Sequence, residues 1–200
     1  MTQMLPLRTG WLPAPGGSDD YPPDLPPEWR LAYFANDFRG VLVPEGLWRG
    51  AAPAGLAGWG AETPARFRFF LELAESDPEG GVAAAVALGD RFGGLVGSAR
   101  ALACLPESGL ARLIRVSAAE PAGTALPVGC GRAWVVPPPL VKDLRGACAW
   151  VEAMVQGQGP QAVVAGEMPN ASRPLVALLG ACRFEDLSRW QAMLELMGLA

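Results

Sequence analysis

Residues 21–73 decide the fold of this chain, and they read YPPDLPPEWRLAYFANDFRGVLVPEGLWRGAAPAGLAGWGAETPARFRFFLEL. A proline-rich loop leads into a predicted helix, a short apolar strand, a loop, a second helix at 53–62 and a second strand. Parallel βα units have this order of elements. The stretch therefore predicts an α/β fold built on a parallel sheet.

The first helix and strand of this stretch are marked by spacing and by their end residues. Leu31, Phe34 and Phe38 recur at helical spacing, and Gly40 is the residue type that ends a helix as its C-cap. Residues 41–43 (VLV) then form a continuous apolar run. Such a run suits a strand that is covered on both faces, as in a parallel sheet.

The strand at 67–73 (FRFFLEL) shows apolar and polar residues in alternation, which is the period of a β-strand. Glu72 lies near its carboxyl end. Two interpretations of this acid stay open. It could project into the mouth of a barrel, or it could form an ion pair with an arginine.

Outside residues 21–73 the alternation of strands and helices continues. Further strands are predicted at 5–11, 111–117, 133–136 and 161–165. Further helices are predicted at 82–88, 141–156 and 184–199, with a short helical piece at 174–179, while residues 95–96 fit either element. The pattern predicts one α/β domain over residues 1–200 with a mainly parallel sheet, either an open sheet or a TIM-type (β/α) barrel. A complete eightfold barrel takes about 250 residues, so a barrel of this length is compact or incomplete.

Composition excludes several classes of function. The net charge is −4 and no run of basic residues occurs, which argues against a nucleic-acid partner. Arg112 and Arg115, which flank two apolar residues, favour a solvated or salt-bridged surface over a phosphate site.

The chain has no histidine, so histidine-based triads and imidazole acid–base chemistry are excluded. Catalysis would have to rest on carboxylates, Tyr, Cys, Arg or the single lysine, Lys142.

No metal, cofactor or membrane contact is predicted. The four cysteines lie far apart, and without histidine they indicate free, buried thiols in a reducing cytoplasm rather than a zinc site. Residues 89–94 (GDRFGG) lack the spacing of a phosphate-binding glycine loop. The start of the chain lacks a long apolar segment, and no apolar run is long enough to span a membrane. We therefore expect a cytoplasmic protein.

A family resemblance rests on the motif WGAETPARFRFF, which begins at Trp59. A Trp, then Thr-Pro, then an F-x-F strand resembles the YecE-like family, also called domain of unknown function 72. Further residues similar to that family are Tyr21, Pro22, Arg30, Leu31, Tyr33, Phe34, Ala35, Phe38 and the segment 88–93 (LGDRFG). The resemblance covers the first half of the chain, up to about residue 100. It implies a TIM-type barrel of a family without a settled activity.

Departures from the family pattern are equally specific. Where the family has an acid and an asparagine on the second strand (V-E-I-N), residues 41–44 read VLVP. The family's lysine after the F-x-F strand is replaced by Glu72 or its neighbour, and the family's Thr-His and Glu-x-Arg-His segments are absent. Apolar groups thus replace polar ones that would line a pocket. The resemblance implies that any activity of the family has been lost or changed here.

Candidate site residues fall in loops and at strand ends, where barrel proteins build their sites. The carboxylates that could act as catalytic acids or bases are Glu45, Glu72 and Glu167. The candidates for ligand binding are Trp11, Asp20 (next to Asp19), Tyr21, Trp48 and Asn170, with Glu45 and Trp48 expected in a loop.

Three functions stay open. The chain is a non-catalytic, degenerate barrel that binds a small ligand or a protein partner, a carboxylate-based enzyme, or a subunit of a homo-oligomer or complex. The third would use exposed aromatic anchors such as Trp11, Trp29 and Trp48.

Overall fold

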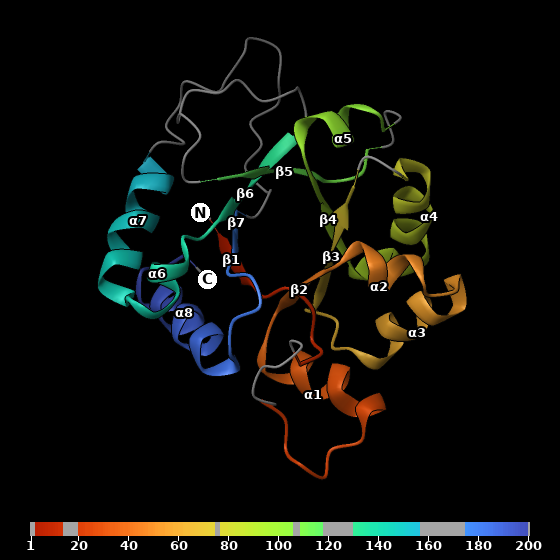
Figure 1. Ribbon diagram of the computed structural model, residues 1–200, viewed down its shortest axis with the longest axis horizontal. Coiled ribbons are helices and arrows are strands. Elements are labelled where there is room, and N and C mark those ends of the chain that lie inside the picture. The colour runs from red at the N-terminus through yellow and green to blue at the C-terminus, as the bar shows by residue number, and fades with distance from the viewer. Residues whose placement is uncertain are drawn as a thin grey trace.

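Seven parallel strands form a nearly closed barrel in the computed structural model, which describes residues 3–13, 20–74, 77–105, 109–117, 130–156 and 175–199 (Figure 1). The strands are β1 (Met4–Leu7), β2 (Gly40–Val43), β3 (Arg68–Leu73), β4 (Phe92–Gly97), β5 (Arg112–Val116), β6 (Cys130–Val135) and β7 (Leu175–Leu178). Their order is β1-β7-β6-β5-β4-β3-β2, and every neighbouring pair is parallel. The alternation left an open sheet and a TIM-type barrel as alternatives, and the structure has the TIM-type barrel with a parallel sheet.

Helices lie around the outside of the barrel (Figure 1). They are the 3-10 turns η1 (Pro27–Trp29) and η2 (Gly89–Arg91) and the helices α1 (Arg30–Asp37), α2 (Glu45–Arg49), α3 (Pro53–Glu62), α4 (Pro78–Leu88), α5 (Ala99–Ala103), α6 (Pro138–Lys142), α7 (Leu144–Gln156) and α8 (Phe184–Leu196). Within the described ranges, no helix combines the length and the apolar character that crossing a membrane requires.

The gap between the edge strands β1 and β2 is spanned just beyond the end of β1. Thr9 forms a parallel bridge with Leu42. The backbone N–H of Leu42 donates to the carbonyl of Arg8 over 3.0 Å, and the N–H of Gly10 donates to the carbonyl of Leu42 over 2.7 Å. These bonds bring the two edges of the sheet together.

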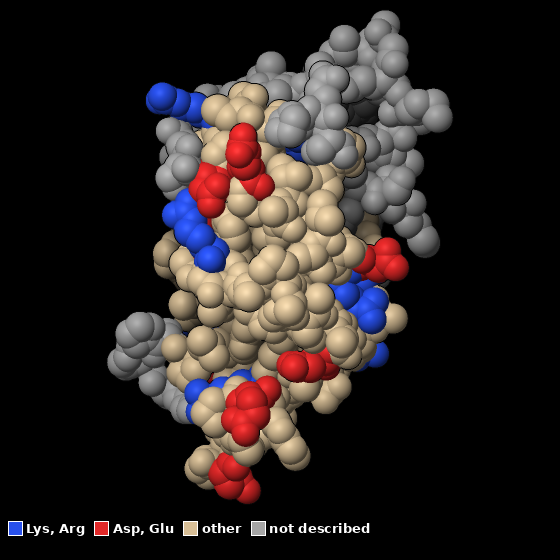
Figure 2. Space-filling view, turned by 90° about the vertical axis from the view of Figure 1, so that its right-hand side faces the viewer, with Lys and Arg blue, Asp and Glu red and all other residues tan. Residues whose placement is uncertain are grey.

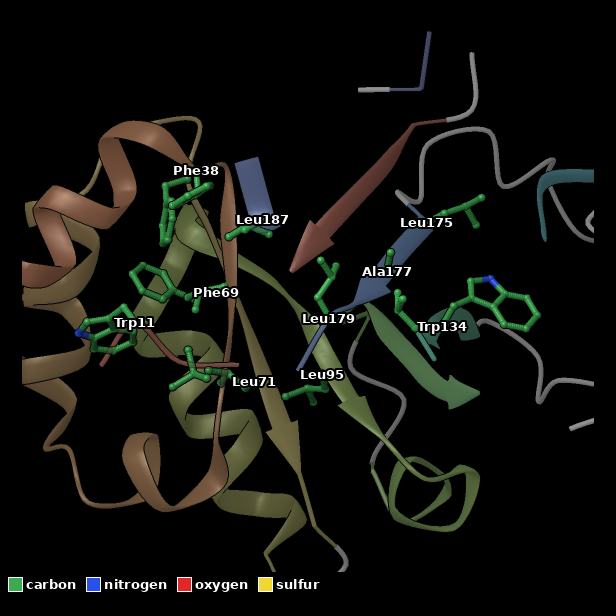
Figure 3. Packing of buried hydrophobic residues seen from close by; sticks show 14 of the residues in the cluster. Trp11, Phe38, Phe69, Leu71, Leu95, Trp134, Leu175, Ala177, Leu179 and Leu187 are labelled. Atoms are coloured by element: carbon green, nitrogen blue, oxygen red, sulfur yellow. The ribbon is translucent and has the colours of Figure 1, made fainter. Parts of the chain in front are cut away.

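The strands are buried on both faces. The inner face carries a cluster made only of strand residues, each at most 4% exposed: Leu7, Leu42, Phe70, Val96, Leu113, Ala133, Val176 and Leu178. The outer face packs against the helices in a second cluster that includes Phe69, Leu71, Leu95, Trp134 and Leu187 (Figure 3). Burial on both sides explains why the strand at β2 is an uninterrupted apolar run.

Large side chains fill the barrel interior where a neighbouring strand has glycine. A Cβ added at Gly93 would lie 2.7 Å from the ring of Phe70, and one at Gly131 would lie 2.7 Å from a methyl of Leu113. Large residues opposite small ones are a common way to fill a narrow barrel. The interior is therefore packed rather than hollow.

Two predicted elements differ in the structure. Residues 174–179 were expected to be helical, but the described part forms the strand β7, which pairs with β1 and β6. A short apolar run fits a buried strand or a helix equally well, so periodicity could not decide. Residues 95–96, left open by the sequence, belong to β4. The strand predicted at 161–165 lies outside the described residues.

The segment after β2 is a short helix, α2, rather than the expected loop. Pro44 sits at its N-cap, and Glu45 in the first turn pairs with Arg49 one turn later over 2.7 Å. An acid in the first turn followed by a base four residues on stabilises even a short helix.

The cysteines are free, as predicted, but they are not all buried. Cys104 is exposed, Cys130 and Cys148 are partly buried, and Cys182 is buried. Burial raises the pKa of the Cys182 thiol from its ordinary 9.0 to about 12, although the nearby positive charge of Arg8 acts in the opposite direction.

We expect Gly93→Ala to destabilise the protein by about 1–3 kcal/mol, because the new methyl group would overlap the Phe70 ring inside the barrel. Urea denaturation measures the change. Gly58→Ala, in α3, is the matched control, since nothing lies within 4 Å of the added carbon. The control should gain up to about 1 kcal/mol from helix propensity. Equal effects at the two sites would contradict the packed interior.

We expect Cys182 to resist alkylation in the folded protein at a pH near 10, while Cys104 reacts, as peptide mass spectrometry after iodoacetamide treatment would show. The unfolded thiol ionises near 9.0, whereas the folded thiol keeps its proton up to about 12. Rising pH between these values removes the proton from the unfolded state alone, so this group's contribution to stability is lost across that window. Equal labelling of both residues at that pH would contradict the burial.

Candidate functional site

An ion pair lies on the inner face of the barrel at the carboxyl ends of the strands. Glu72 on β3 and Arg115 on β5 each come two residues after a side chain of the inner cluster, Phe70 and Leu113. Because side chains alternate between the faces of a strand, both charged groups face the barrel mouth. The Nη2 of Arg115 donates to Oε1 of Glu72 over 2.6 Å, across β4.

The pair rests on an apolar floor and remains open to solvent. Phe70, Val96 and Leu113 are buried inner-face residues of β3, β4 and β5. The side chain of Glu72 is 31% exposed and that of Arg115 is 38% exposed. The Nε of Arg115 is enclosed and has no hydrogen-bond acceptor among the described residues. Both open interpretations of Glu72 thus hold at once, since the acid lies in the mouth and pairs with an arginine.

Glu45 lies elsewhere, at the start of α2. Its carboxylate pairs with Arg49, and Arg49 also pairs with Asp77 over 3.2 Å. This is a surface network of alternating charge. Within this network Glu45 is paired with a guanidinium and not with another carboxylate.

Asp20 connects its own loop to the segment after β1 and to the start of α8. Its carboxylate is nearly buried and accepts hydrogen bonds from Arg8 over 3.3 Å, from Arg183 over 3.2 Å and from the backbone N–H of Phe184 over 3.3 Å. Arg183, the N-cap residue of α8, makes no side-chain cap of its own. Asp20 therefore caps this helix from a distant part of the chain, where its negative charge also complements the helix dipole.

The predicted aromatic ligand residues are packed inside the protein. Tyr21 is buried, its hydroxyl donates to the carbonyl of Trp11, and its ring packs edge-on against Phe184. Trp11 is buried against Trp59, with ring centroids 4.9 Å apart.

Trp48 is also buried, and its indole N–H donates to the backbone carbonyl of Glu72 over 2.8 Å. The expectation that Trp11 and Trp48 are exposed anchors is wrong, because their rings complete the layer between barrel and helices. Trp29 is exposed, at 64%.

Three of the residues considered from the sequence, Asp19, Glu167 and Asn170, lie outside the described residues. Sequence reasoning missed Arg115 as a partner of Glu72. The signal was present, because Arg115 follows the buried Leu113 at a two-residue spacing near the end of its strand. No cluster of three or more potential metal ligands occurs in the part of the chain that the structure describes.

Comparisons with known proteins show similarity in fold only. No family model matches the sequence, and no curated protein matches it. The crystal structure of a DUF72 family protein from Enterococcus faecalis V583 is similar to this chain with a TM-score of 0.52 and 11% sequence identity, over 100% of this chain and 99% of that one.

Orotidine 5'-monophosphate decarboxylase from Metallosphaera sedula is similar at a TM-score of 0.44 and 14% identity, over 100% of this chain and 98% of that one. The chain thus shares its fold with a member of the family that its first half resembles, domain of unknown function 72.

Proposed function

We propose that this chain is a non-catalytic barrel that binds a small ligand at its mouth, with Glu72 and Arg115 as the contacting residues. The observation that carries the proposal is a charged, partly exposed pair that lies next to the apolar inner cluster. Ligand sites in proteins commonly combine apolar walls with a few polar groups that fix orientation.

Stability alone gives little reason for this pair. A partly exposed ion pair contributes about 0–1 kcal/mol, and replacing even a buried ion pair by well-packed apolar residues is often neutral or stabilising. All seven strands contribute apolar residues to the inner cluster, and among the residues described β3 and β5 alone add an ion pair of this kind at the mouth. A role in recognition accounts for charges that the fold does not need.

Binding is favoured over catalysis by the identity of Glu72's partner. Arginine keeps its proton in proteins, so the group beside Glu72 cannot serve as a second general acid or base. The competing proposal, a carboxylate-based enzyme, draws support from the place of Glu72 at a strand end. A protein partner or a second copy of the chain would instead use exposed residues such as Trp29. A cytoplasmic location remains a prediction.

We expect the double variant Glu72→Leu/Arg115→Met to keep its fold, with a free energy of unfolding within about 1 kcal/mol of the parent, and to lose binding of small molecules. Urea denaturation gives the stability, and ligand-induced NMR shifts with a panel of small metabolites give the binding. The matched control is Glu45→Leu/Arg49→Met, which removes a surface pair.

Two results would count against the proposal. If the mouth variant binds the same metabolites as the parent, the ligand site lies elsewhere. If a bound metabolite is converted by the parent and not by Glu72→Gln, the chain is a carboxylate-based enzyme instead.

A further inference from the structure

We infer that the ligand carries an oxyanion, either a carboxylate or a phosphate, beside a hydrogen-bond donor, and that Arg115 binds the oxyanion while Glu72 accepts from the donor. The inference rests on the proposed function and narrows it to a chemical class. It follows from the donors and acceptors of Glu72 and Arg115 that have no partner among the described residues.

Arg115 has more donors than the described residues use. A guanidinium presents five N–H groups in a planar fork, and the described residues supply an acceptor to its Nη2, namely Oε1 of Glu72. Its enclosed Nε has no acceptor there. The planar fork matches the paired oxygens of carboxylates and phosphates better than any neutral group, so an oxyanion is the ligand group that this side chain selects.

Glu72 places a second requirement on the ligand. Its carboxylate keeps acceptor capacity beyond the bond to Arg115, and nearly a third of the side chain is exposed. A ligand that presented only negative charge would be repelled by this carboxylate. A hydroxyl or an ammonium group next to the oxyanion donates a hydrogen bond to Glu72, and this bond offsets the repulsion between the two negative charges.

The floor of the mouth limits how the ligand sits. Phe70 and Leu113 lie two residues before the pair on their strands, and Val96 of β4 is paired in register with Glu72 and with Leu113. All three are buried, so apolar side chains fill the interior next to the pair. Apolar walls also strengthen electrostatic contacts, because they reduce screening by water. The ligand therefore meets the charged pair first, and the pair decides which small molecules are held.

The test uses 15N-labelled protein and follows the Nε–Hε signal of Arg115, assigned with Arg115→Lys, at constant ionic strength. The probes are glycolate, glycerol 3-phosphate, acetate and ethylene glycol. We expect saturable shifts with glycolate or glycerol 3-phosphate, and the stronger of the two tells whether carboxylate or phosphate is preferred. Acetate, which lacks the donor, should bind about tenfold more weakly than glycolate, and neutral ethylene glycol should not bind.

Two variants separate the roles of the pair. Glu72→Gln should reduce the preference for glycolate over acetate, because it removes the repulsion of the bare anion, and Arg115→Gln should abolish binding of both, read from backbone amide shifts around the mouth. Arg49→Gln, in the surface network, is the control and should leave all four titrations unchanged.

Each failure has a distinct meaning. If ethylene glycol binds as well as glycolate, or if only other neutral metabolites bind at the mouth, the oxyanion inference is wrong while the proposed function stands. If neither the four probes nor the metabolite panel shifts any signal at the mouth, both are wrong.

Discussion

The hydrogen bonds of Leu42 with Arg8 and Gly10 are the contacts on which the rest of the structure depends. Without them β1 and β2 would be the two free edges of an open sheet, with unpaired backbone groups. With them the sheet curls into a barrel that has an inner face, an outer face and two ends. In such a barrel the pair of Glu72 on β3 and Arg115 on β5 lies at the mouth of an enclosed interior and not on one face of an open sheet.

The same closure is tied to the outer layer through a single side chain. The backbone carbonyl of Arg8 accepts the hydrogen bond from the N–H of Leu42, and the guanidinium of Arg8 pairs with Asp20. Asp20 in turn caps α8, the last described helix. Asp20 and Tyr21, which were predicted to touch a ligand, thus join segments that lie far apart in the sequence. The Glu72–Arg115 pair lies at the mouth.

The fold could be predicted from the sequence because the features that specify it are local. The apolar run at 41–43, the spacing of Leu31, Phe34 and Phe38, and the alternation through β3 each reflect one element and its burial. The DUF72-like motifs pointed to the same architecture, and the similarity to the E. faecalis structure agrees in fold. The strand β7 was missed, because its four apolar residues become a strand only between β1 and β6.

The site was harder to predict, since it depends on contacts between distant segments. Glu72 could be named as a candidate, but its partner lies 43 residues away and two strands over. Trp11 and Trp48 were expected to be exposed, because no local pattern tells a loop aromatic from one buried by the helices that follow. Burial of this kind is set by the packing of the whole barrel.

Hydrogen–deuterium exchange of three amides tests barrel closure most directly. If β1 and β2 are joined, the amides of Leu42 and Gly10 exchange as slowly as that of Leu95, which donates to the carbonyl of Ala111 between two central strands. If Leu42 and Gly10 exchange at the rate of exposed loop amides while Leu95 stays protected, the sheet is open at this seam, and the shared mouth of Glu72 and Arg115 is contradicted.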